Sequence, residues 1–477
     1  MKYNAFANFL IEQFPYDPTK DQIELLNMLA SFILERNDNS LFLIKGYAGT
    51  GKTTVVSNLV KVLPMIKAKT VLLAPTGRAA KVMASYSETT AFTIHKKIYR
   101  THTNKDGTSG LKLVENKHKN TFFLVDEASM IPANSSFDTS EPFAARNLLD
   151  DLIHYVYSGE NCRLILIGDT AQLPPVMADE SPALNPTYLQ TSYNIDVHTA
   201  ELREVVRQAQ DSGILHNATI LRRMLTNDHA GFPKFELDGF SDIVRLEGYD
   251  VGDAINSAFS YRQCEDSVIV CRSNKRANLY NLNIRNRVLL LEDEICAGDL
   301  MMIVKNNYFW LPKSSQAGFI ANGDIVEIKR IRRTQELYGF RFADVTVRLL
   351  DYPDEPELDV NIILDSVYVD GPSLNREQTK LLFEQVEEDY VDYTNRRTRL
   401  AKIKANPHFN ALQVKFAYSL TCHKSQGGQW KNVFVEMGYI PNNEPDIEYL
   451  RWLYTAMTRA TDKLYLIGFP DDFFIKI

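Results

Sequence analysis

The sequence has few of the features that mark membrane, secreted or disulfide-bonded proteins. Its 477 residues contain no apolar run close to the roughly 18 residues that a membrane-spanning helix needs. The first residues lack the apolar core and the cleavage site of a secretory signal. The five cysteines are scattered and form no CxxC pair, so reduced thiols are expected rather than disulfides or zinc sites. These absences predict a cytoplasmic protein.

An excess of charge of one sign is also missing. The chain carries 53 Lys and Arg against 60 Asp and Glu, which gives a net charge of −7. This balance argues against a protein that wraps duplex DNA by bulk electrostatics. It leaves open a narrow basic channel that follows a single strand. The length of 477 residues predicts more than one domain.

The first part of the chain alternates strand-like apolar runs with helix-like stretches. Four runs end in polar or glycine residues, at 41–46, 70–75, 121–127 and 163–169. Alternating strands and helices form a parallel sheet, and ligands bind beyond the carboxyl ends of its strands. We therefore expect the chemistry at one sheet edge. Later runs predict a second α/β domain, at 267–274, 415–427, 432–438 and 463–469.

A different pattern interrupts the second α/β domain. Residues 298–370 contain short β-like runs separated by turn signals, which predict a small inserted β-barrel. The stretch that follows, 376–404, is charged and helix-permissive. The predicted domains are 1–200 for the first α/β domain, 201–297 with 405–477 for the second, and 298–404 for the insertion.

A glycine-rich loop follows the first strand. It fits the pattern G-x-x-x-x-G-K-[ST], in which backbone N–H groups hold phosphates, the lysine neutralises their charge and the threonine binds Mg²⁺. The predicted nucleotide contacts in this loop are Gly46, Ala48, Gly49, Thr50, Gly51, Lys52, Thr53 and Thr54. A kinase, a switch GTPase, a transporter engine or a nucleic-acid motor could carry such a loop.

Two further strand ends complete the predicted hydrolysis site. Asp126 would hold Mg²⁺ together with Thr53, and Glu127 would orient and deprotonate an attacking water. A glutamate directly after the aspartate favours hydrolysis over transfer to a metabolite. Gln172, in GDTAQLPPV (168–176), carries an amide suited to sensing a γ-phosphate. The spacing alone does not distinguish a γ-phosphate sensor from an ordinary turn before Pro174 and Pro175.

Taken in order, eight motifs resemble those of a superfamily 1 DNA helicase, and most closely the 5′→3′ branch of the RecD, Dda and Pif families. They are GYAGTGKTT, APTGRAAK (74–81), TIH (93–95), DEASM, GDTAQLPPV, EVVRQ (204–208), TCHKSQG (421–427) and YTAMTRA (454–460). The resemblance covers nearly the whole chain. It implies two RecA-like motor domains, a hairpin insertion at about 97–120 in the first and an SH3-like barrel in the second.

The resemblance also implies an enzyme that uses ATP and Mg²⁺ to move 5′→3′ along single-stranded DNA and to unwind duplex DNA. Gln22 matches the adenine-recognising glutamine of the family, and Arg207 and Arg459 match two arginines that reach the γ-phosphate from the second motor domain. Contacts to the DNA strand are implied for Pro75, Thr76, His95, Ser273, Asn274, Thr421, His423 and Lys424.

An alternative function stays open, namely a nucleotide-dependent single-stranded-DNA clamp or remodelling subunit within a repair or recombination complex. Expected partners are single-stranded and tailed duplex DNA and repair or replication proteins, with the chain acting as a monomer. Residues 99–120 take the position of the strand-separating pin of relatives. No aromatic occurs from 101 to 120, so the wedge residue stays unassigned.

Overall fold

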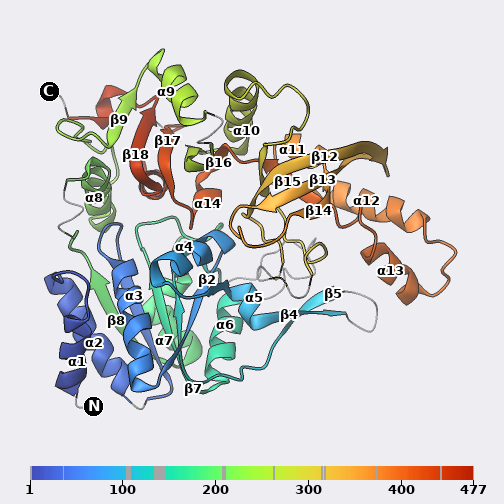
Figure 1. The fold of residues 1–477 in the computed structure, drawn as a ribbon. Helices are drawn as coiled ribbons and strands as arrows, with labels where there is room; N and C mark the ends of the chain where they lie inside the picture. The colour runs from blue at the N-terminus through green and yellow to red at the C-terminus, as the bar shows by residue number, and fades with distance from the viewer. Residues whose placement is uncertain are drawn as a thin grey trace.

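The computed structural model describes residues 3–35, 37–103, 109–133, 147–206, 211–260, 264–312, 315, 319–371, 373–440 and 443–475. Figure 1 shows two α/β units, one above the other, and a β-barrel to one side of them. Within the described ranges, no helix combines the length and the apolar character needed to cross a bilayer.

The first unit is a six-stranded parallel sheet in the order β3-β2-β6-β7-β1-β8. Its strands are β1 (Ser40–Gly46), β2 (Lys69–Ala74), β3 (Ala91–Thr93), β6 (Lys119–Val125), β7 (Glu160–Gly168) and β8 (Asp196–Leu202). Its helices are α1 (Tyr3–Glu12), α2 (Lys20–Leu34), α3 (Lys52–Val62), α4 (Gly77–Ser87), α5 (Ile94–Ile98), α6 (Leu148–Tyr157) and α7 (Pro186–Tyr193).

Both faces of this sheet are buried because successive side chains of a strand point to opposite sides. Phe42 and Ile44 of β1 enter one apolar core, and Leu41 and Leu43 enter the other. This explains why the sequence shows continuous apolar runs rather than strict alternation. The predicted hairpin is present between α5 and β6. β4 (Tyr99–Thr103) pairs antiparallel with β5 (Ser109–Leu113).

The second unit is a five-stranded sheet in the order β16-β10-β17-β18-β9, with parallel neighbours. Its strands are β9 (Ile243–Leu246), β10 (Ser267–Cys271), β16 (Ser419–Thr421), β17 (Trp430–Glu436) and β18 (Ala460–Ile467). Its helices are α8 (Gly213–Thr226), α9 (Asp250–Ala258), α10 (Asn274–Asn283), α14 (Cys422–Ser425) and α15 (Ile447–Met457).

The insertion is a closed barrel of five strands. They are β11 (Leu300–Ile303), β12 (Ile325–Leu337), β13 (Phe340–Leu349), β14 (Leu358–Ile363) and β15 (Leu412–Phe416). The two parallel sheets and the barrel confirm the predicted fold class. The predicted return to the second α/β domain at residue 405 lies before β15, which closes the barrel by pairing with β11 and β14.

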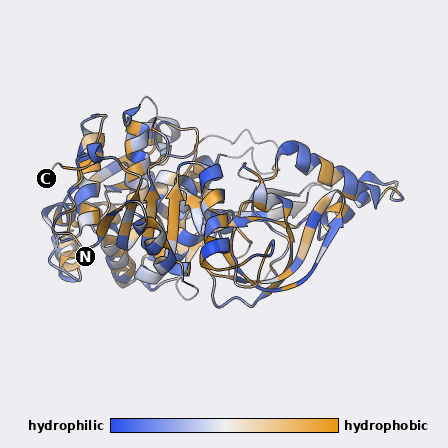
Figure 2. Cartoon of the chain, turned by 90° about the horizontal axis from the view of Figure 1, so that it is seen from above, coloured by the Kyte–Doolittle hydropathy of each residue, from blue (hydrophilic) through white to orange (hydrophobic). Residues whose placement is uncertain are grey.

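A helical arm extends from the barrel between β14 and β15. The short helix α11 (Asp365–Tyr368) precedes it, and its two helices are α12 (Arg376–Glu388) and α13 (Arg396–Lys404). Leu382, Val386 and Ile403 pack with Phe342 in a small core of their own. Figure 2 shows that the arm, at the right of the view, is largely hydrophilic on its outside. The arm is therefore anchored by a few apolar side chains, and the charges seen in the sequence lie on its surface.

Candidate functional site

The phosphate loop joins the end of β1 to the start of α3. Gly49 and Gly51 have φ values of 73° and 82°, a region that glycine adopts without strain. Lys52 folds back over the loop, and its Nζ donates to the carbonyls of Gly46 and Tyr47, each at 2.8 Å. No side chain caps the first turn of α3. Its leading N–H groups therefore suit a phosphate ligand.

Gln22 of α2 lies against this loop, with only 2% of its surface exposed. Its Nε2 donates to the Thr50 carbonyl at 3.0 Å, and its Oε1 accepts from the Thr19 N–H at 3.0 Å. Gln22 also lines a cavity of about 480 Å³ with Tyr16, Thr54 and other residues. Both ends of the amide are engaged here. Adenine recognition by Gln22 would therefore use the second hydrogen of its Nε2 or the second lone pair of its Oε1.

Asp126 is held from two sides directly after β6. Its Oδ1 accepts from the Glu127 N–H at 2.8 Å, and its Oδ2 accepts from the Tyr86 hydroxyl at 2.7 Å. Burial, reinforced by the Asp126 carboxylate, raises the pKa of Tyr86, so the phenol stays a donor. Sequence reasoning missed Tyr86, because nothing in α4 indicates which side chain reaches the neighbouring strand end.

The donors predicted for Mg²⁺ are the Thr53 hydroxyl and the Asp126 carboxylate. Within the described ranges, no three His, Cys, Asp or Glu residues gather closely enough to hold a metal ion. Two hard oxygen donors fit a Mg²⁺ ion that keeps phosphate and water as its other ligands. The residues present therefore fit that ion, and its binding here stays a prediction.

Glu127 adopts a left-handed backbone conformation with φ 52°, which is costly for a residue with a side chain and is concentrated at functional sites. Burial raises the pKa of its carboxyl, while the positive charges of Arg459 and Lys52 oppose that rise. A raised pKa brings a carboxylate closer to the range in which it takes up a proton. The environment of Glu127 therefore suits the predicted base.

Arg459 follows α15 in the second unit and is 4% exposed. Its Nε donates to the Thr455 carbonyl at 3.0 Å, and its Nη1 donates to the Gly428 carbonyl at 3.3 Å. The guanidinium is thus fixed by its own unit while its charge acts on Glu127 of the first unit. Arg207, the other predicted arginine, lies outside the residues that the structure describes.

Gln172 lies in the loop 169–173 after β7. The residue is 6% exposed, and within the described part of the chain its Oε1 has no hydrogen-bond partner. The loop is held by α15, because Arg451 Nη1 donates to the Thr170 carbonyl at 2.6 Å and the Leu173 N–H donates to Thr455 Oγ1 at 2.8 Å. A buried amide oxygen without a partner suits a site that another group completes.

The predicted strand-binding residues of the first unit meet at the ends of β2 and β3. These strands pair so that Ala74 lies opposite Thr93, which brings Pro75 and Thr76 close to His95. Thr76 Oγ1 caps α4 by accepting from the Ala79 N–H at 3.2 Å. Burial lowers the pKa of His95 to about 4. Its ring is therefore neutral near pH 7 and would hold a phosphate by hydrogen bonding rather than by charge.

A matching group forms in the second unit at the ends of β10 and β16. Thr421 lies opposite Cys271, and the chain then continues into Ser273 and Asn274 on one side and into His423 and Lys424 on the other. His423 is exposed. Burial lowers the pKa of Lys424 to about 8, and it makes no ion pair with any residue that the structure describes. A partly buried lysine without an acidic neighbour suits a phosphate ligand.

The two groups of strand-binding residues face each other across the units. A Cβ atom at Gly427, in TCHKSQG, would lie 2.9 Å from both Thr76 Oγ1 and the Ala79 Cβ. The nucleotide residues lie at the ends of other strands of the first sheet, namely β1, β6 and β7. The residues predicted to bind nucleotide (the nucleotide side) and those predicted to bind a strand (the strand side) therefore lie at different places on one pair of units.

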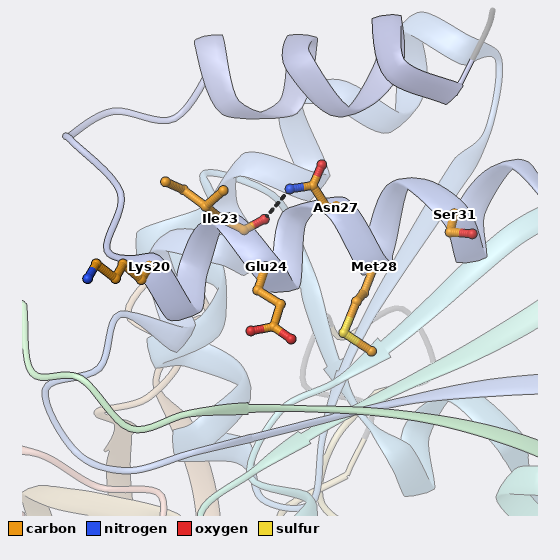
Figure 3. A pocket seen from close by; sticks show the side chains of 6 residues that line it. All are labelled: Lys20, Ile23, Glu24, Asn27, Met28 and Ser31. Atoms are coloured by element: carbon orange, nitrogen blue, oxygen red, sulfur yellow. Dashed lines mark hydrogen bonds between the residues drawn. The ribbon is translucent and has the colours of Figure 1, made fainter.

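A hollow on the outer face of α2 lies away from both sides. It measures about 610 Å³, and Figure 3 shows the six residues that line it, with Asn27 donating to the Ile23 carbonyl. The residues are Lys20, Ile23, Glu24, Asn27, Met28 and Ser31. By helical spacing they lie opposite Gln22. The hollow holds no grouped catalytic side chains.

Two family models match the two units. Residues 21–230 match the model of an AAA domain, and residues 416–467 match that of a UvrD-like helicase C-terminal domain. The ATP-dependent DNA helicase Dda of Enterobacteria phage T4 is 22% identical, over 94% of this chain and 99% of that protein. The chain thus combines an AAA domain with a UvrD-like helicase C-terminal domain, and it is similar to the Dda helicase over nearly its whole length. It is an ATP-hydrolysing helicase.

Two further comparisons extend over the length of the helicase. An uncharacterized protein of Acanthamoeba polyphaga mimivirus is 25% identical, over 94% of the helicase and 98% of that protein. A solved structure of Pif1 helicases at forked double-stranded DNA covers 96% of the helicase and 94% of that chain, with 14% identity and a TM-score of 0.48.

Proposed function

We propose that this helicase moves 5′→3′ along single-stranded DNA and separates duplex DNA ahead of it, driven by hydrolysis of ATP between its two units. One observation carries the proposal. The groups predicted to hold a strand, around Thr76 and around Gly427, face each other across the same two units that bring Arg459 toward Glu127. Closure at the nucleotide would therefore change the grip on the strand.

The hydrolysis step follows from the residues of the cleft. Lys52 would exchange the Gly46 and Tyr47 carbonyls for phosphate oxygens of ATP. Glu127 would take a proton from the water that attacks the γ-phosphate, and the Arg459 guanidinium would neutralise charge that develops on it. Thr53 and Asp126 would hold Mg²⁺, which supplies further neutralisation of phosphate charge.

Arg459 supplies the link from hydrolysis to movement. A guanidinium from the second unit reaches the γ-phosphate only when the units are close together, so ATP would favour the closed arrangement by the free energy of that contact. Loss of the γ-phosphate removes the contact and lets the units separate. The residues for both steps lie on one chain, and we propose that a monomer is the acting unit.

A hydrolysis assay tests whether the helicase is driven by ATP and responds to DNA. Single-stranded DNA should stimulate ATP hydrolysis, and higher salt should weaken the binding because phosphate contacts release counterions. Glu127→Gln should keep ATP binding and lower hydrolysis by about 10²–10⁴-fold. Hydrolysis that does not respond to DNA would overturn the proposal.

An unwinding assay tests direction. Duplexes with a 5′ single-stranded tail should be separated, and those with a 3′ tail should not. Efficient unwinding from a 3′ tail alone would reverse the proposed polarity. DNA-stimulated hydrolysis without strand separation from either tail would instead indicate the clamp or remodelling subunit.

A further inference from the structure

Helix α15 of the second unit presents three side chains to the first unit. Tyr454 and Thr455 follow Arg451 by three and four residues, so both lie beside Arg451 on the surface of the helix. Arg451 and Thr455 bond the backbone of the loop 169–173, as described above. Tyr454, between them, makes a contact that joins two separate parts of the nucleotide side.

The hydroxyl of Tyr454 bridges the phosphate loop and the start of the loop 169–173. It accepts the N–H of Ala48 at 2.8 Å and donates to Asp169 Oδ2 at 2.7 Å. Tyr454 and Asp169 are each 1% exposed, so water does not compete for these bonds. Burial raises the pKa of Tyr454 well above its usual range, which keeps the hydroxyl protonated as a donor.

The bridge continues to the strand side of the molecule. Asp169 Oδ1 accepts from the Ala171 N–H at 2.9 Å, which fixes the loop that carries Gln172. At the other end of that loop, the Leu173 carbonyl accepts from Gln426 Nε2 at 2.9 Å. Gln426 lies two residues after Lys424, in TCHKSQG. One chain of contacts therefore runs from the phosphate loop to the segment predicted to hold the strand.

We propose that Tyr454 is a positioning residue that couples the strand side to the nucleotide side through its hydroxyl. This inference rests on the proposed function. Movement of α15 as the units grip a strand would shift Ala48 and Asp169 together, and with them the phosphate loop and Gln172. The proposal predicts a defect in DNA-stimulated turnover and little change in ATP binding.

Tyr454→Phe isolates the hydroxyl, because the ring still fills its space. Tyr449→Phe is the matched control. It lies on the same helix, is fully buried, and donates its hydroxyl to the Met437 carbonyl at 3.1 Å within the second unit. Initial rates of ATP hydrolysis are measured for both variants and for the wild type, with and without an oligothymidylate strand.

We expect Tyr454→Phe to lower the DNA-stimulated kcat by about tenfold, the effect of one or two lost buried hydrogen bonds, and to change the KM for ATP by less than about threefold. Tyr449→Phe should keep both values. Equal DNA-stimulated kcat values for the two variants would overturn the inference alone. A wild type that DNA does not stimulate would overturn the proposed function, and this inference with it.

A double-mutant cycle with Asp169→Asn tests whether the Tyr454 hydroxyl acts through Asp169. It also keeps the inference testable if Tyr454→Phe lowers the melting temperature. If the hydroxyl acts through Asp169, the double variant should lose no more DNA stimulation than the more affected single variant. Losses that multiply would show two independent effects and would overturn the bridge.

Discussion

Within the described ranges, two sets of contacts of different chemistry join the first α/β unit to the rest of the helicase. On the nucleotide side, side chains of α15 and the amide of Gln426 hold loops of the first unit. Apart from Arg451, the side chains in these bonds are neutral, and the first-unit atoms that they bond are backbone N–H groups and carbonyls. Hydrogen bonds of this kind contribute modest net free energy, because the same groups bond to water when the units are apart. Such an interface suits contacts that a nucleotide rearranges.

On the barrel side, the contacts are made by charged groups. Arg78 and Lys81 of α4 each lie 3.8 Å from Asp351 Oδ1, and Lys81 also donates to the Leu350 carbonyl at 2.7 Å. Asp324 Oδ1 would be 2.5 Å from a Cβ atom at Gly77, so the barrel packs directly on the start of the helix. Asp324 and Asp351 are both buried.

Because their chemistry differs, we expect different signals to act on the two interfaces. Burial raises the pKa of Asp324 to about 8, and the negative charge of the neighbouring Asp351 adds to this rise. The protonation of Asp324 on the barrel side would therefore respond to pH, whereas nucleotide and strand would act on the side held by α15. Four substitutions test this comparison, beginning with the largest expected effect.

Arg459→Ala should strongly lower ATP hydrolysis, the reaction proposed for the nucleotide side. Loss of a guanidinium that neutralises charge on a transferred phosphate typically costs about 10³-fold or more in kcat. DNA-stimulated hydrolysis measures the loss. Arg223→Ala, at an exposed position on α8, is the control and should hydrolyse ATP normally. Normal turnover in Arg459→Ala would show that the residue has been given the wrong role.

Tyr86→Phe should have a smaller effect on ATP hydrolysis than Arg459→Ala. It removes the donor to Asp126 Oδ2 and leaves the ring in place. Groups that orient a metal ligand typically change metal affinity by about 10- to 100-fold, so hydrolysis should need about tenfold more Mg²⁺ for half-maximal rate. A Mg²⁺ titration of the rate provides the measurement. An unchanged titration would separate Tyr86 from the metal site.

Gly77→Ala should destabilise the packing of the barrel against the start of α4. The added methyl group meets Asp324 and the Tyr352 hydroxyl, and overpacking of this kind costs about 1–3 kcal/mol. Thermal or urea unfolding measures the change. Gly252→Ala, where an added Cβ meets nothing within 4 Å, should be tolerated. Hydrolysis without DNA should change little in either variant. Equal stability of the two would argue against close packing at α4.

Asp324→Asn should change how the stability of the protein depends on pH. The pKa of Asp324 is about 8 when folded, against an ordinary value of 3.8. The folded protein therefore holds one more proton than the unfolded chain between these values, and stability falls as the pH rises through that window. Asparagine imitates the protonated acid. The variant should match the wild type near pH 4 and melt about 2–4 °C higher near pH 9.

Melting curves of both proteins across this range provide the measurement. The groups that face Asp324 from the neighbouring elements, namely Asp351, Arg78 and Tyr352, are common to both proteins, so the difference between the two curves reports on Asp324. Parallel curves would contradict a buried, protonated Asp324.

Several features of the helicase followed from local sequence. The phosphate loop was predictable because glycines at 49 and 51, a preceding apolar strand and a following helix form one continuous segment. The same holds for Asp126 and Glu127 at the end of β6. The residues predicted to bind a strand lie at the ends of paired strands, because adjacent parallel strands end at the same edge of a sheet; their contact with a strand stays a prediction.

Other features lay beyond sequence patterns. The interpretation of Gln22 as adenine-recognising did not foresee that Thr19 and Thr50 engage both ends of its amide. The contacts of Tyr86 and Tyr454 gave no signal, although Tyr454 begins the motif YTAMTRA, because a phenol buried against a distant carboxylate looks like any other core aromatic. β15 looked like a strand of the second sheet, because an apolar run does not specify its pairing partner.

Residues close together in the chain were therefore enough to predict the elements, the order of the motifs and the two kinds of candidate site. Which groups meet across the units depends on the folded chain. Ala48, Asp169 and Tyr454 come from three separate segments, and their contact depends on the packing of α15 against the first unit. A hydrogen bond requires two atoms within about 3 Å of each other, and only the folded chain sets that distance.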